Sequence, residues 1–291
     1  MKRSKKRLAN LMKMAGPGFI TGASDDDPSG IATYSQTGAQ FGYNQAWTAL
    51  WTFPFMVAIQ EMCGRIGVVT GKGLAGVIRK HYPKSLLYTA VGLLFLANTV
   101  NLGANLGAMA AAAKLLIPLP FTVLLFLMTA ITLILEIFVS YHTYVKYLKF
   151  LALSLLAYVL AAFMIKIDWL EVLYHAVTPK IVFSSDYWVN IVAVLGTTIS
   201  PYLFFWQANQ EVEESVLAGK LARYGWGKPK IDIRDIRRMK KDTVIGMFFS
   251  NLVMFFIIIM AAVTLNASGI YRIESASQAA EALRPLAGEM T

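Results

Sequence analysis

The sequence predicts an all-α membrane protein whose first and sixth hydrophobic helices are each interrupted next to a proline. Hydrophobic residues make up 56% of the 291 residues and charged residues only 15%. The mean hydropathy is +0.53, a balance that is rare in water-soluble domains of this size. The lipid bilayer is therefore the expected surroundings of the chain. Two broken helices, five helices apart, are typical of membrane proteins built from inverted repeats.

Seven helices are expected from the stretches that lack Asp, Glu, Lys and Arg, because a spanning helix needs about 20 mostly apolar residues. Three aspartates interrupt the first helix, and a turn at Gly42-Tyr43-Asn44 separates it from the second. The stretches are 14–24 and 28–60 for helices one and two, 85–113 for helix three, 115–135 with a turn at 118–120 for helix four, 150–165 for helix five, 187–210 for helix six and 243–271 for helix seven.

The positions of Lys and Arg support this order of helices and predict a cytoplasmic N-terminus. If the N-terminus lies inside, 22 of the 27 basic residues fall in inside segments, as the positive-inside rule requires. The net charge of +10 is spread between apolar runs, which argues against nucleic-acid binding. We expect a protein integral to a bacterial-type cytoplasmic membrane. A short basic helix near 231–239 is expected to contact lipid headgroups, with partner binding as the alternative.

Three consecutive aspartates, Asp25 to Asp27, are the most informative residues, because an ionised carboxylate near the bilayer centre costs at least about 2.5 kcal/mol. A cation or water must compensate this cost. Pro28 lacks an N–H group and biases Asp27 away from helical geometry, and Gly30 favours a loop. We expect the helix to unwind from Asp27 to Gly30. The carbonyls at the negative end of its first half would then be free to bind a cation.

A second interruption is expected in helix six, from Gly196 to Tyr202, where Ser200 precedes Pro201. Proline kinks are common in membrane helices, so either interruption alone is compatible with an ordinary kink. Two interruptions, one of them rich in carboxylates, favour a cation site near the middle of the membrane.

Several motifs resemble the Nramp family of divalent metal transporters. The stretch Gly16-Pro17-Gly18-Phe19-Ile20, followed by Asp27-Pro28-Ser29-Gly30 and Gly38-Ala39-Gln40-Phe41-Gly42-Tyr43, looks like the first helix of that family. The segment from Gln60 to Lys72 is similar to its second helix. The resemblance implies a LeuT-like fold of two inverted five-helix repeats. Such a fold needs ten core helices, so the chain is expected to be truncated after the seventh.

The resemblance also implies how the chain is divided. Residues 1–13 are expected to form a basic cytoplasmic N-terminus and 14–166 the first repeat, with helices one to five. Residues 187–271 are expected to begin the second repeat, with helices six and seven joined by a cytoplasmic loop at 211–242. Residues 272–291 are then an extracellular segment.

The chain departs from the family pattern where the family binds its ion. Typical members have Asp-Pro-Gly-Asn in helix one and Met-Pro-His in helix six. This sequence keeps Asp27 but has Gly30, Ser200 and Tyr202 in place of Asn, Met and His. Oxygen ligands without a thioether suit Mg²⁺ or Mn²⁺, and the extra room suits a partly hydrated Mg²⁺. The pattern is similar to Nramp-related magnesium transporters, so we expect transport of Mg²⁺, or alternatively Mn²⁺, without a resident cofactor.

Asp27 is the expected primary ligand, and Asp26 is expected behind it or at the entrance of the site. The carbonyl oxygens of Ser24 and Thr197 are implied by the matching family positions, and Ser200 is expected to coordinate directly or through water. Ordinary helix packing remains the simpler explanation of two of the pathway candidates, Tyr202 and Gln207. The expected metal-site residues are Asp26, Asp27, Ser24, Gly30, Thr197 and Ser200, and the expected pathway residues are Asp25, Tyr202 and Gln207.

Helix three lacks the acidic residues that typical relatives use to carry protons, and Asn105 stands near the expected carboxylate. Proton relays inside a membrane need titratable groups. Uncoupled, facilitated uptake is therefore expected, with proton-coupled symport of Mn²⁺ or Fe²⁺ as the alternative. The remaining acids of the helix ends are expected to form structural ion pairs, Glu61 with Arg65 and Glu136 with Lys146 or Lys149.

Enzyme and receptor functions fit the sequence less well. An intramembrane aspartyl protease would need a second aspartate on another helix, and the apolar interiors of helices two to seven offer none. A seven-helix receptor of the common kind has the opposite orientation. Cys63 is expected to be a packing residue, and His81, His142 and His175 are expected in loops or at helix ends. We therefore expect no catalytic zinc site and no enzymatic activity.

Overall fold

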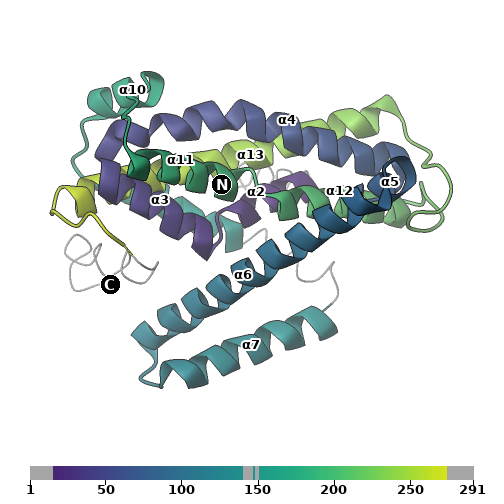
Figure 1. Cartoon of the computed structure of the whole chain (residues 1–291), viewed down its shortest axis with the longest axis horizontal. Helices are drawn as coiled ribbons and strands as arrows, with labels where there is room; N and C mark the ends of the chain where they lie inside the picture. Colours follow the sequence, from purple (N-terminus) through teal and green to yellow (C-terminus); the bar gives the residue numbers. More distant parts are fainter. Residues whose placement is uncertain (1–15, 140–146, 148–150, 274–291) are drawn as a thin grey trace, which may run out of the picture. The chain divides into compact units, whose positions relative to one another are not determined.

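The computed structural model describes residues 16–139, 147 and 151–273, which form helices joined by turns (Figure 1). Within these ranges the backbone forms no named strand. The chain divides into two compact units. The first unit comprises residues 1–25, 53–99 and 199–250, and the second comprises residues 26–52, 100–198 and 251–291.

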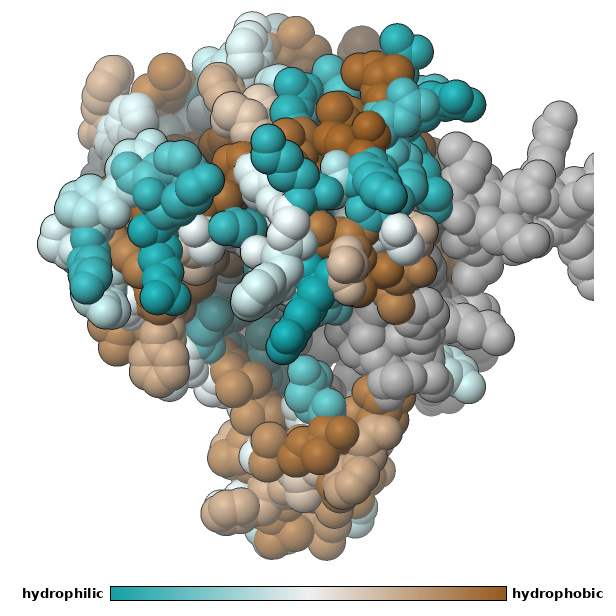
Figure 2. Space-filling view, turned by 90° about the vertical axis from the view of Figure 1, so that its right-hand side faces the viewer, coloured by the Kyte–Doolittle hydropathy of each residue, from teal (hydrophilic) through white to brown (hydrophobic). Residues whose placement is uncertain are grey.

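Four helical segments in the described ranges are long and apolar enough to cross a membrane. Apolar side chains face outward on Lys84–Leu116 and Phe121–Phe138: Val100 is 74% exposed and Phe126 is 72% exposed. In Figure 2 hydrophobic residues cover the lower part of the visible face, whereas hydrophilic residues are frequent in its upper part. Exposed apolar side chains are the ones that hydrocarbon solvates. The four segments are Lys84–Leu116 (α6), Phe121–Phe138 (α7), Ser185–Leu217 and Ile233–Asn266.

The predicted position of helix five agrees with a shorter apolar stretch, Leu153–Met164. Its first residues form a 3-10 turn, η2 (Ala152–Leu155), and the rest form α9 (Leu156–Met164). The predicted turn after the first helix is also present, as the 3-10 turn η1 (Gly42–Gln45) that leads into α4 (Trp47–Thr70). Gly42 has a φ of +57°, a conformation that glycine adopts without a steric penalty.

Two short helices lie between the long ones. The first, α5 (Leu74–His81), ends at His81, and the second, α10 (Trp169–Val177), has His175 in its last turn. The carboxylate of Asp168 caps α10 by accepting hydrogen bonds from the next N–H groups, those of Leu170 and Glu171. The prediction that these two histidines lie at helix ends is therefore confirmed, and His142 lies outside the described residues.

The loop after helix six is shorter than predicted. The second half of helix six, α12 (Pro201–Leu217), continues beyond Gln210, and α13 (Ile233–Ala261) begins before the apolar residues of helix seven. The prediction of a separate basic helix near 231–239 was wrong, because residues 233–239 form the first turns of α13. No proline interrupts the sequence there, and the acid Asp235 in the first turn favours a helix start at that point.

In the first unit, α2 (Pro17–Asp25) packs against α12 and against the first half of α13 (Figure 1). The contact with α13 depends on glycine. A Cβ atom added to Gly22 would lie 2.1 Å from the carbonyl oxygen of Gly246. A Cβ atom added to Gly18 would lie 2.6 Å from the backbone nitrogen of Thr243. Small residues allow this close approach of two helix backbones.

In the second unit, α3 (Pro28–Phe41) packs against α11 (Ser185–Thr198) and against η3 (Ala262–Asn266), a π-helical turn that follows α13. Buried polar contacts join these elements. The amide of Asn190 on α11 donates to the hydroxyl of Thr37 at 2.9 Å and to the side-chain oxygen of Gln45 at 2.6 Å. Each unit thus contains one half of the first broken helix paired with one half of the second broken helix.

Candidate functional site

Both interrupted helices break over two residues directly before a proline. The first break is Asp26–Asp27, between α2 and α3, and the second is Ile199–Ser200, between α11 and α12. Asp27 has φ −73° and ψ 173°, and Ser200 has φ −87° and ψ 124°. These extended conformations are the ones that a following proline imposes.

The two breaks are narrower than the sequence predicts. Gly30 was expected in the first unwound stretch but lies in the first turn of α3, and Gly196 and Tyr202 likewise lie within α11 and α12. The reason is that each proline occupies the first turn of the next helix, where its missing N–H group has no intrahelical partner to lose. The helix therefore resumes at the proline instead of after it.

The carboxylate of Asp27 accepts four hydrogen bonds. Its Oδ1 atom accepts from the hydroxyl of Ser29 at 2.6 Å and from the backbone N–H of Gly30 at 2.9 Å. Its Oδ2 atom accepts from the side-chain amides of Asn101 at 3.1 Å and Asn105 at 3.0 Å. The bonds to Oδ1 make Asp27 the N-cap of α3. Gly30, expected among the metal-site residues, thus donates its backbone N–H to the carboxylate of Asp27. It has no side chain with which to bind metal.

Asn101 and Asn105 lie four residues apart on α6, and therefore on one face of that helix. The Oδ1 atom of Asn105 is buried and accepts no hydrogen bond from the described residues. Sequence reasoning noted Asn105 but missed Asn101. The sequence could have indicated Asn101, because polar side chains are rare in a long apolar helix and these two amides lie four residues apart.

The other two aspartates of the triplet are buried. Asp26 is 4% exposed and Asp25 is fully buried. Within the first unit, the Oδ2 atom of Asp25 accepts a hydrogen bond of 2.8 Å from the hydroxyl of Ser250 on α13. Asp25 was expected along the ion path. In this unit its carboxylate also links α2 to α13.

The expected carbonyl ligands lie at the ends of half-helices. Ser24 is in the last turn of α2, and Thr197 is in the last turn of α11, where its hydroxyl donates back to the carbonyl of Ala193 at 2.6 Å. The last four carbonyls of a helix lack intrahelical partners and carry the negative end of its dipole. Both residues are thus placed where a carbonyl oxygen is available to a cation.

The candidates on α12 differ in their surroundings. Ser200 is buried at the second break, and Tyr202 lies in the first turn of α12 and is partly exposed. Gln207 is fully buried, and its amide donates to the hydroxyl of Thr243 on α13 at 2.7 Å. That contact agrees with ordinary helix packing, the simpler explanation of Gln207.

The charged residues predicted at the helix ends form an ion pair where the structure describes both partners. The guanidinium of Arg65 donates to Glu61, its Nε atom at 2.9 Å, one helical turn away on α4. The predicted partners of Glu136, Lys146 and Lys149, lie outside the described residues. In the described part of the chain, no three His, Cys, Asp or Glu side chains are grouped as they would be around a metal bound by protein alone.

The sequence of this chain is similar to those of known proteins. A family model described as Nramp, natural resistance-associated macrophage protein-like, matches residues 18–291. A divalent metal cation transporter MntH of Brucella suis biovar 1 (strain 1330) is 26% identical over 293 residues, which cover 98% of this chain and 62% of that protein.

Two further relatives carry the same printed name. The MntH of Aeromonas hydrophila subsp. hydrophila is 27% identical over 286 residues, covering 96% of this chain and 66% of that protein. The MntH of Klebsiella pneumoniae (strain 342) is 37% identical over 90 residues, covering 30% of this chain and 22% of that protein. The chain thus spans less than two thirds of the length of these curated relatives.

Proposed function

Because this chain belongs to the Nramp family, we propose that it carries divalent metal cations across a membrane, with the carboxylate of Asp27 as the central ligand. Relatives that align with nearly the whole chain are named divalent metal cation transporters, which supports the proposal. The four helical segments with the length and hydropathy of membrane spans support the membrane location. The expected LeuT-like arrangement of inverted repeats is part of the same proposal.

The surroundings of Asp27 carry the proposal. A carboxylate at a helix break, held by two donors from its own helix start and two from an apolar helix, is oriented before any ligand arrives. Charge in an apolar environment needs a compensating partner. A divalent cation that replaces the amide hydrogen bonds at Oδ2 would supply that partner. The unsatisfied Oδ1 atom of Asn105 is then a candidate second oxygen ligand.

The ligand chemistry favours Mg²⁺, with Mn²⁺ as the alternative. The proposed ligands are the carboxylate of Asp27 and the amide oxygen of Asn105, and oxygen ligands suit hard cations. Mg²⁺ usually keeps several waters and binds protein through one or two carboxylates. A site with few protein ligands agrees with that mode of binding, as does the lack of a larger cluster of His, Cys, Asp and Glu among the described residues.

We propose that uptake is not coupled to protons. The two α6 side chains that contact Asp27 are amides, and amides neither bind nor release a proton between pH 5 and 8. A proton-coupled symport of Mn²⁺ or Fe²⁺ would need a titratable side chain at these positions of α6. It is the alternative that a measurement of internal pH distinguishes.

The first experiment measures binding of Mg²⁺, Mn²⁺ and Cd²⁺ to the purified chain by isothermal titration calorimetry. We expect Asp27→Asn to weaken Mg²⁺ binding by about ten-fold or more, the cost of losing one charged contact. The matched control is Asp186→Asn, which removes an exposed aspartate in the first turn of α11. Binding of Cd²⁺ with exclusion of Mg²⁺ would contradict the choice of metal, and unchanged binding in Asp27→Asn would contradict the site.

The second experiment measures metal flux into proteoliposomes that contain a pH-sensitive dye. We expect uptake of Mg²⁺ or Mn²⁺ down their gradients without acidification of the interior. Stoichiometric acidification during uptake would show that protons are coupled and would replace the uncoupled mechanism.

A further inference from the structure

Basic side chains gather on one face of the first turns of α13. Their spacing of three and four residues places them along a single stripe of that helix. With Asp242 and Ile245 they line a cavity of about 360 Å³. The basic residues of this cavity are Arg234, Arg237, Arg238 and Lys241.

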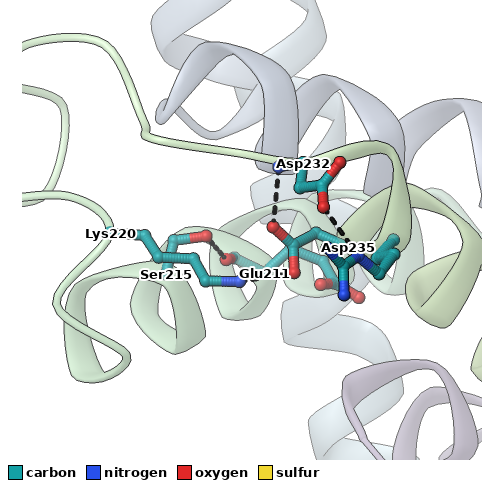
Figure 3. A network of polar contacts seen from close by, with 6 residues as sticks. Glu211, Ser215, Lys220, Asp232 and Asp235 are labelled. Carbon is teal, nitrogen blue, oxygen red and sulfur yellow. Dashed lines mark hydrogen bonds and ion pairs between the residues drawn. The ribbon is translucent and has the colours of Figure 1, made fainter.

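The nearby acids are already engaged, one of them with Arg234 of the cavity itself. Asp232 accepts from Arg234 at 2.8 Å, and Asp235 pairs with Lys220 (Figure 3). Asp242 accepts from the backbone N–H groups of Gly16 at 2.7 Å and Gly18 at 2.8 Å. The carboxylate inside the cavity is thus largely satisfied by backbone donors.

The side chains of Arg237 and Lys241 form no ion pair or hydrogen bond with another residue in the part of the chain that the structure describes. Both side chains are exposed. Several cations around one cavity repel one another, and an anion relieves that repulsion. Arginine forks match the oxygens of a phosphate group, and a lysine adds a further donor. The cavity therefore suits a phosphate-bearing ligand.

The same helix face continues into exposed apolar side chains. Ile245 borders the cavity and is 44% exposed, and Phe248, one turn further along, is 56% exposed. Residues 241, 245 and 248 are spaced by four and three, so phosphate-binding and apolar groups follow one another on one stripe. A ligand with a phosphate head and hydrocarbon tails would use both parts, whereas a soluble phosphate would use only the first.

We propose that this stripe binds an anionic phospholipid of the membrane, with its phosphate in the basic cavity and its acyl chains along Ile245 and Phe248. Basic groups at the start of a spanning helix lie where lipid headgroups are found. Long basic side chains also reach such headgroups readily. The proposal is independent of the metal site, because none of these residues belongs to the Asp27 cluster.

The test compares phosphatidylglycerol binding by the purified full chain and two double variants, using native mass spectrometry of lipid-doped micelles. The cavity variant is Arg237→Gln with Lys241→Gln. The control is Lys230→Gln with Lys240→Gln, which removes the same charge from exposed positions that do not line the cavity. We expect about ten-fold weaker lipid binding in the cavity variant, from lost charged contacts, and binding close to that of the parent in the control.

A third variant, Phe248→Ser, tests the apolar part, and glycerol phosphate tests the phosphate group alone. We expect Phe248→Ser to weaken lipid binding and glycerol phosphate to compete poorly. Equal losses in the two double variants would show only bulk attraction and overturn the proposal. Full competition by glycerol phosphate would assign the cavity to a soluble anion and also overturn it. Native-like thermal unfolding of each variant shows that it has folded.

Discussion

Asn105 of α6 donates a hydrogen bond of 3.0 Å to Oδ2 of Asp27, 78 residues earlier in the chain. This bond brings a neutral amide against the carboxylate that begins α3. Asn101, one turn away, donates to the same oxygen atom. An amide holds and orients a carboxylate without adding charge, whereas an acid in its place would compete for the same proton or cation.

Replacement of Asn105 tests this contact. We expect Asn105→Leu to weaken Mg²⁺ binding by about ten-fold, because it removes the Oδ1 atom that we propose as the second oxygen ligand, and one contact to a charged group contributes roughly 1.5–3 kcal/mol. Calorimetric titration of the purified chain measures the change. The control is Thr99→Val on the same helix. Among the described residues, the hydroxyl of Thr99 bonds only to the carbonyl of Phe95. Equal Mg²⁺ affinity in the Asn105→Leu variant and the parent would show that the amide does not support the metal site.

Asp27 has two roles that one substitution can separate. Serine caps helix starts almost as well as aspartate but carries no charge. We therefore expect Asp27→Ser to keep the cap of α3 while losing metal binding and the hydrogen bonds from Asn101 and Asn105. Asp27→Ala should also lose metal binding and should be less stable than Asp27→Ser by about 1 kcal/mol in thermal unfolding, because it lacks the cap as well. Metal binding that survives in Asp27→Ser would contradict the assignment of this carboxylate as a ligand.

The close approach of α2 and α13 predicts a strong difference between two glycines. Gly22→Ala places a Cβ atom 2.1 Å from the carbonyl oxygen of Gly246, and we expect it to destabilise the protein by about 1–3 kcal/mol through overpacking. Gly103→Ala on α6 meets no atom within 4 Å, so the better helix propensity of alanine should leave stability unchanged or higher. Thermal unfolding in detergent compares the two variants. Similar midpoints would show that α2 and α13 are not in contact through Gly22.

Asp242 predicts a local effect on the start of α2. Asp242→Asn turns one of two acceptor oxygens into a donor that faces the N–H groups of Gly16 and Gly18. We expect a loss of about 1–3 kcal/mol and faster amide hydrogen exchange in residues 18–21. Asp232→Asn is the control, because it removes only an exposed ion pair with Arg234, whose contribution is at most about 1 kcal/mol. Unchanged exchange in the Asp242→Asn variant would contradict the contact.

The sequence predicted where the two helices break, because the cause is local. A proline restricts the residue before it, and both breaks end at a proline. The exact length of the breaks was predicted less well, since Asp27 caps α3 and lets the helix resume at Pro28. The start of helix seven was also predicted less well than its position. Its charged first turns were expected to form a separate helix, and they continue into the apolar part because no proline separates the two.

The sequence alone determined the membrane-spanning character, the two breaks and the Nramp motifs, since hydropathy, proline geometry and residue order are properties of the chain itself. The tertiary structure decided which side chains surround each aspartate. Asn101 and Asn105 reach Asp27, and Ser250 reaches Asp25 only because helices distant in sequence pack together. Contacts of this kind depend on the relative position of whole helices, which no local pattern of residues encodes.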